Sequence, residues 1–153
     1  MSEIARIADQ LQRAFEGTAF HGPAVREVLK DVSAEQASRR PIPQAHTIWE
    51  IVQHIAGWQA EIRNRLQGQK AQTLPAEKNF PKLQDASEEA WRQTLQQLDT
   101  GYRELKETML KFPEARLVDN VPGRDYSFYV LLHGIVQHDL YHAGQIALLK
   151  KAR

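Results

Sequence analysis

Three histidines occupy positions where helical periodicity would place apolar residues. His138 and His142 are four residues apart, so in a helix one lies a turn above the other on the same face. On a helical wheel both fall within about 20° of Leu131, at the centre of an apolar stripe. His54 lies about 60° from Ile51, on the shoulder of an earlier apolar stripe, from which its ring can turn inward. The pattern predicts three imidazoles, from two helices, directed into one core.

A metal ion is the chemistry that best accommodates such a cluster. A buried imidazole needs partners for both nitrogens, and each unmet group costs about 1–3 kcal/mol. A divalent ion removes most of this cost, because neutral imidazole donates a lone pair at about 2.0–2.1 Å. We therefore predict a metal site formed by His54, His138 and His142. Three such ligands leave at least one coordination position open, where a thiol or water would have a lowered pKa.

The other histidines carry less information. We expect His133 to face outward and His21 to lie in a Gly–Pro turn. His46 precedes a long helix and is expected at the surface, although it could also line the mouth of a bundle. Gly134, one turn before His138, leaves space for a substrate or permits close helix packing, and the sequence alone is compatible with both. Outer partners for the imidazoles could come from residues nearby in sequence, namely Glu61, Asp139 and Gln145.

Helical periodicity dominates the chain and predicts an all-α fold, a four-helix bundle with short accessory helices. Thr47 and Glu50 have the spacing of a capping box at the start of the second long helix, and Ser127 can cap the last one. The segment 69–84 reads as a long polar loop, either a lid or binding loop or a plain crossover connection. The long helices are expected at about residues 3–16, 47–66, 86–110 and 128–150, and shorter ones at 23–31 and 33–38.

Length and composition restrict the functional classes. The 153 residues suit a single domain spanning 1–153. With a net charge of +1 and no basic stripe, nucleic acid is not an expected partner. The absence of cysteine excludes disulfides and thiolate ligands within the chain. Charges near the N-terminus and short apolar runs argue against a signal peptide and a membrane partner, so we expect a cytoplasmic protein.

Two stretches of the sequence resemble motifs of the DinB-like (YfiT-type) superfamily. One is His46-Thr-Ile-Trp-Glu-Ile-Val-Gln-His54-Ile-Ala-Gly-Trp58, and the other is His138-Asp-Leu-Tyr-His142-Ala-Gly-Gln145-Ile. The resemblance extends in order and spacing over nearly the whole chain. It implies an up-down-down-up bundle, nickel or zinc on the three histidines, and frequent homodimers. Some members of that superfamily are S-transferases that use bacillithiol, mycothiol or glutathione.

Three functional hypotheses follow from these observations. The first is a metal-dependent enzyme that activates a low-molecular-weight thiol as an S-transferase, or water as a hydrolase, acting on a small substrate. The second is a non-catalytic metal-stabilised bundle, serving as a sensor or dimerisation module, which would need a fourth protein ligand to close the site. The third is haem ligation, which suits His138 and His142 poorly because they share one face of one helix. No residue in the sequence identifies a thiol, a native metal or a catalytic side chain other than the ligands.

Overall fold

The computed structural model describes residues 1–152, and within them the regular structure is entirely helical. This confirms the predicted all-α class. Three short α-helices and one 3-10 helix (η1) supplement four long helices. The long helices are α1 (Glu3–Phe15), α4 (Ile48–Leu66), α6 (Glu88–Leu110) and α7 (Phe128–Lys151). The short elements are α2 (Val25–Leu29), α3 (Ala34–Ser38), α5 (Ala76–Asn79) and η1 (Glu114–Val118).

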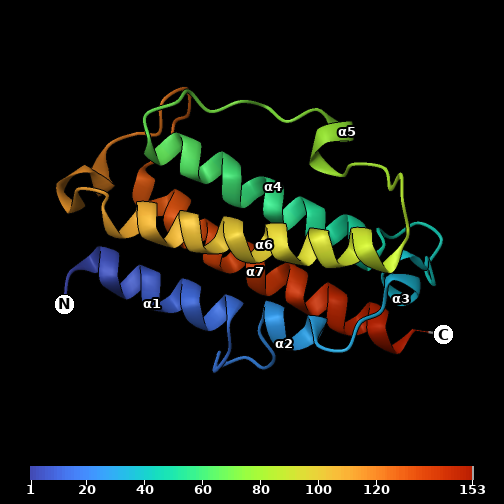
Figure 1. The fold of residues 1–153 in the computed structure, drawn as a ribbon. Helices are drawn as coiled ribbons and strands as arrows, with labels where there is room; N and C mark the ends of the chain where they lie inside the picture. The colour runs from blue at the N-terminus through green and yellow to red at the C-terminus, as the bar shows by residue number, and fades with distance from the viewer. Residues whose placement is uncertain (153) are drawn as a thin grey trace.

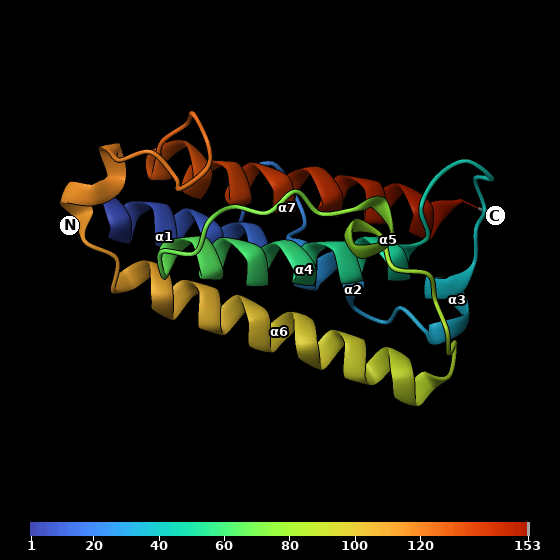
Figure 2. The ribbon, with the colours of Figure 1, turned by 90° about the horizontal axis from the view of Figure 1, so that it is seen from above.

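The four long helices lie side by side around one apolar core. α4 packs against α6 and α7, and α1 packs against the same two helices from the opposite side of the core. Along the chain their directions follow the order up, down, down, up, because α1 and α7 run one way and α4 and α6 the other (Figures 1 and 2). α4 and α7, which carry the three histidines of interest, are therefore antiparallel neighbours.

The start of α4 is set by the predicted capping box. The Thr47 hydroxyl accepts a hydrogen bond from the Glu50 backbone amide, and the Glu50 carboxylate accepts one from the Thr47 amide. These two bonds satisfy amides that the first turn of a helix leaves without partners. Because the helix begins at Ile48, His54 falls on the side of α4 that faces the bundle, where it is buried. Ser127 caps α7 as predicted, through a hydrogen bond from the Val130 amide.

The structure corrects the sequence predictions at several points. The segment 69–84 is not only loop, since it contains α5 and lies over α4 on the side toward α7 (Figures 1 and 2). The stretch between α6 and α7 contains η1, and the helix expected at 23–31 is confined to α2. His133, predicted to be exposed, is half-buried because its ring packs against Tyr129 and its Nε2 lies 4.0 Å from Glu3.

None of the helices in residues 1–152 combines the length and the apolar character that a bilayer crossing would require.

Candidate metal centre

The three predicted histidines meet between α4 and α7. The Nε2 atom of His138 lies 2.9 Å from Nε2 of His54 and 3.1 Å from Nε2 of His142. One ligand atom from each of the three residues falls within 4.8 Å of the others. Ligands about 2.05 Å from one ion lie roughly 2.9 Å apart at octahedral angles and roughly 3.4 Å apart at tetrahedral angles. The distances from Nε2 of His138 to the other two Nε2 atoms, 2.9 and 3.1 Å, therefore suit atoms that bind a common ion.

Hydrogen bonds at the outer nitrogens fix the tautomers of two of these imidazoles. Nδ1 of His54 donates to the backbone carbonyl of Asn79 over 2.9 Å, and Nδ1 of His142 donates to Oε1 of Gln145 over 2.6 Å. Each neutral ring carries one proton, so Nε2 of His54 and Nε2 of His142 hold bare lone pairs. Both lone pairs are directed at Nε2 of His138, which can donate to only one of them. A cation at this point would satisfy all of the nitrogens that meet there, so the donor set fits a metal ion.

Burial keeps the three rings neutral, which is the form that binds metals. Desolvation lowers the pKa of His138 to about 4 and that of His142 to about 4, and it also lowers the pKa of His54. For His142 the neighbouring His138 adds a smaller effect in the same direction. Lone pairs are therefore available on all three side chains near neutral pH.

Asp139 lies beside this cluster without any hydrogen bond. Its side chain is fully buried, both carboxyl oxygens lack a partner, and Oδ1 lies 3.8 Å from Nδ1 of His138. Nδ1 of His138 is likewise unpartnered. Burial raises the pKa of Asp139 to about 8. The pair has the composition of a carboxylate–histidine–metal arrangement, although the distance exceeds that of a hydrogen bond.

The segment 69–84 contributes two neighbours of His54. Besides the Asn79 carbonyl, the Phe80 ring stacks on His54 with 4.1 Å between ring centroids. The ring of His46 also stacks on Phe80, with 3.6 Å between ring centroids, and His46 is exposed. The Asn79 side chain also accepts a hydrogen bond from the Trp58 indole. The sequence left open whether this segment is a binding loop or a plain crossover connection. Its contacts favour a binding loop, because Asn79 holds both His54, a candidate metal ligand, and Trp58.

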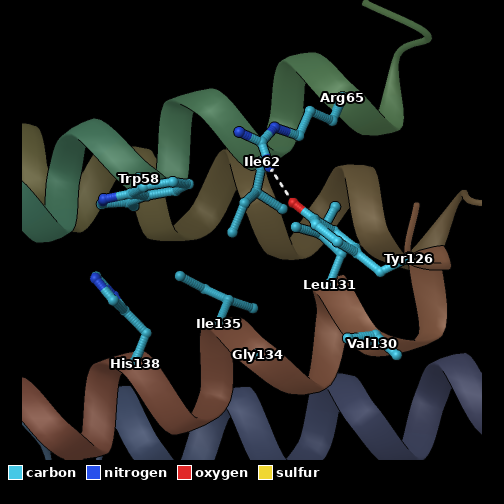
Figure 3. Close-up of a pocket in the computed structure, with 9 residues that line it drawn as sticks. All are labelled: Trp58, Ile62, Arg65, Tyr126, Val130, Leu131, Gly134, Ile135 and His138. Carbon is cyan, nitrogen blue, oxygen red and sulfur yellow. Dashed lines mark hydrogen bonds between the residues drawn. The ribbon is translucent and has the colours of Figure 1, made fainter. Parts of the chain in front are cut away.

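A pocket adjoins the cluster on the side of His138. It encloses about 260 Å³ between α4 and α7, and its lining is almost entirely apolar (Figure 3). A Cβ added to Gly134 would meet no protein atom within 4 Å. Close helix packing therefore does not require this glycine, and the space beside it belongs to the pocket. The walls nearest the histidine are formed by Trp58, Ile62, Leu131, Gly134 and Ile135.

Some contributors to the site had no recognisable signal in the sequence. The Asn79 carbonyl is a backbone group on a short helix inside a predicted loop, so no residue type marked it. Gln145, which the sequence could not assign to a particular imidazole, lies one turn after His142 and accepts the hydrogen bond from its Nδ1. Glu61 is not an outer partner of the histidines, since it binds Arg65 instead. Within residues 1–152 the cluster of ligand atoms consists of these three histidines, with no acidic side chain among them.

Comparison with known protein families identifies the superfamily of the chain. The sequence model of the DinB superfamily matches residues 19–146, which include all three histidines. The chain belongs to the DinB superfamily. No match was found among curated proteins or among solved structures.

The bond from His142 to Gln145 gives a test of the metal site. Outer partners orient a ligating imidazole, and their loss weakens metal affinity by about 10–100-fold. We expect Gln145→Ala to weaken zinc binding by that factor in competition with a chromophoric chelator. Gln137→Ala is the matched control, because Gln137 is an exposed glutamine on the same helix. Equal affinities of the two variants would contradict the assigned role of Gln145.

The lowered histidine pKa values predict how the metal-free protein responds to acid. The pKa values of His138 and His142 are about 4 in the folded chain and about 6.5 in the unfolded chain. Between these values the unfolded chain binds more protons, so the free energy of unfolding decreases as pH falls from about 6.5 toward 4. Urea unfolding in the presence of a chelator measures this slope.

Asp139 contributes the opposite slope, and its variant serves as the control. Its pKa is about 8 when folded and about 3.9 when unfolded, so its contribution to stability decreases as pH rises through that window. Asp139→Asn should therefore remove a loss of stability that the wild-type protein shows between about pH 6.5 and 8, and it should steepen the histidine-dependent loss of stability toward acid pH, which Asp139 opposes. Wild-type stability that increases toward pH 5 would contradict the assigned histidine pKa values.

Proposed function

We propose that this protein is a divalent-metal enzyme, with zinc or nickel on His54, His138 and His142, that activates a low-molecular-weight thiol for S-transfer. The observation that supports the proposal most directly is the position of His138. Its ring belongs to the three-nitrogen cluster and also lines the apolar pocket. A thiol activated at the metal would therefore lie next to an electrophile bound in the pocket.

The bound ion would supply Lewis acidity, lowering the pKa of a thiol, or of water in a hydrolase, so that it is a nucleophile near neutral pH. The chain's own residues do the remaining work. The hydrogen bonds from His54 to Asn79 and from His142 to Gln145 hold the imidazoles in the tautomer that turns Nε2 inward. Trp58, held by Asn79, and Ile135 present an apolar surface that excludes water from an electrophile in the pocket.

Thiol transfer is favoured over hydrolysis by the lining of the pocket. Apart from the polar groups at its two ends, the pocket offers no side chain that could position a water molecule. An apolar wall suits a carbon electrophile, and thiolate is a ligand that zinc accepts readily. A non-catalytic, metal-stabilised bundle would need a fourth protein ligand, and the described cluster contains three.

The activity can be tested with a generic electrophile. Zinc- or nickel-loaded protein, given bacillithiol, mycothiol or glutathione with 1-chloro-2,4-dinitrobenzene, should form a carbon–sulfur bond and release chloride and a proton. We expect metal-dependent conjugation with at least one of these thiols. His142→Gln should reduce it by about a hundredfold or more, because it removes a ligand. Full metal loading without turnover across these thiols would contradict the proposal.

A glycine pair provides the matched control for the pocket. Gly134→Leu would place a side chain in the pocket, where its Cβ meets no protein atom within 4 Å, so it should abolish conjugation while metal affinity stays within about twofold. Gly57→Leu adds the same side chain at an exposed helical glycine that also has free space around it, and it should leave conjugation unchanged. If both variants were fully active, the pocket would not be the place of reaction.

We also propose a homodimer, as the sequence resemblance implied. The supporting observation is a set of exposed apolar side chains on α7, formed by Tyr141, Leu148 and Val130, the last of which also lines the pocket. Sedimentation equilibrium should then give twice the chain mass of 17.5 kDa. Tyr141→Lys should shift the equilibrium toward the monomer, and a wild-type protein that remains monomeric at high concentration would contradict the proposal.

A further inference from the structure

The end of the pocket remote from the histidines contains a buried arginine. Arg65 is 1% exposed, one of the most deeply buried large side chains of the protein. Its Nε donates to Oε1 of Glu61 over 2.8 Å, and its Nη1 donates to the Tyr126 hydroxyl over 2.9 Å. The third nitrogen, Nη2, is buried and has no hydrogen-bond partner. An unmet charged donor in an apolar environment is costly, so its retention calls for an explanation.

The guanidinium group of Arg65 forms part of the pocket wall. Arg65 and Tyr126 both line the cavity, and the guanidinium carbon lies 5.4 Å from the centre of the Trp58 ring. Figure 3 shows the guanidinium of Arg65 lying between Trp58 and Tyr126, with His138 at the opposite end of the group. The apolar residues Ile62, Leu131 and Ile135 separate these two polar ends.

The far end can supply two hydrogen-bond donors to a ligand. Nη2 of Arg65 has no acceptor within the protein. The Tyr126 oxygen already accepts from Nη1, so the hydroxyl proton is free to donate to another group. Two hydrogen-bond donors at the same end of the pocket match the oxygens of a carboxylate, and an arginine donor makes its bond charge-assisted. Glu61 offsets part of the positive charge of Arg65, which lowers the cost of burying this cation.

We propose that the substrate is a small, mainly apolar molecule with a carboxylate at one end, which binds Arg65 and Tyr126, while its reacting carbon lies near His138. This inference rests on the proposed function, because it names the substrate class of the same site. Arg65 and Tyr126 act as specificity-determining residues. The apolar middle of the pocket holds the body of the molecule, and the separation of the two polar ends sets its length.

A matched pair of probes tests carboxylate recognition without turnover. 4-Phenylbutyrate and 4-phenylbutanol have the same apolar body and differ in the terminal group. Binding to the purified protein is measured by calorimetry and by tryptophan fluorescence, since Trp58 lines the pocket. We expect the carboxylate to bind about tenfold more tightly than the alcohol. The measurement is repeated after metal removal, because a carboxylate can also bind a metal directly, and the preference should persist.

Variants of the Glu61–Arg65 pair predict changes in opposite directions. Glu61→Gln keeps an acceptor for Nε but removes the competing negative charge, so carboxylate affinity should increase severalfold while alcohol affinity is unchanged. The double variant Glu61→Gln with Arg65→Met leaves no buried charge without a partner, and it should abolish the preference for the carboxylate. Arg63→Met is the control, because Arg63 lies on the same helix and pairs with Glu104, outside the pocket.

Each result decides the inference separately from the proposed function. Equal binding of the two probes, a preference that disappears with the metal, or a preference retained in the double variant would overturn carboxylate recognition. None of these outcomes depends on thiol chemistry. Conversely, a metal-loaded protein that fails to conjugate any thiol would overturn the proposed function, while the probe affinities of the metal-free protein would still decide the role of Arg65. Gly134→Leu should block both probes, which confirms that they occupy this pocket.

Discussion

The convergence of three imidazole lone pairs is the constraint on which the site depends. With the Nδ1 protons of His54 and His142 committed to oxygen acceptors, both Nε2 atoms face Nε2 of His138 at about the contact distance of a hydrogen bond. One proton cannot satisfy two acceptors, so the arrangement is unfavourable without a cation. The bundle holds this geometry because α4 and α7 are anchored by capped N-termini and by a shared apolar core.

The segment between α4 and α6 links the fold to the site. In a plain bundle this connection would only carry the chain back between two helices that run in the same direction. Here it holds His54 through a backbone carbonyl, covers that ring with Phe80, and fixes Trp58 in the wall of the adjoining pocket. The segment is mostly exposed, apart from its contacts with the histidine and the tryptophan. Asn79 therefore joins the histidine cluster to the pocket wall, because its carbonyl accepts from His54 and its side chain accepts from Trp58.

Much of the fold and part of the site could be predicted from the sequence. The long helices and the caps at Thr47 and Ser127 follow from periodicity and local hydrogen bonding, which depend on nearby residues. The histidine cluster was predicted because His138 and His142 interrupt an apolar stripe. The role of Asn79 could not be predicted, because it contacts His54 through its backbone carbonyl and its position depends on the path of a loop. Arg65 had a usable signal, because it lies about 40° from Ile51 on the wheel, closer to the centre of the stripe than His54.

X-ray absorption at the metal edge of the zinc-loaded protein tests the central claim most directly. The structure predicts three imidazole nitrogens at about 2.0–2.1 Å, together with at least one light, exchangeable ligand that is not supplied by the protein. His54→Gln should lower the imidazole count by one. A fit that required four protein ligands, or one without imidazole scattering, would contradict the account of an open three-histidine site.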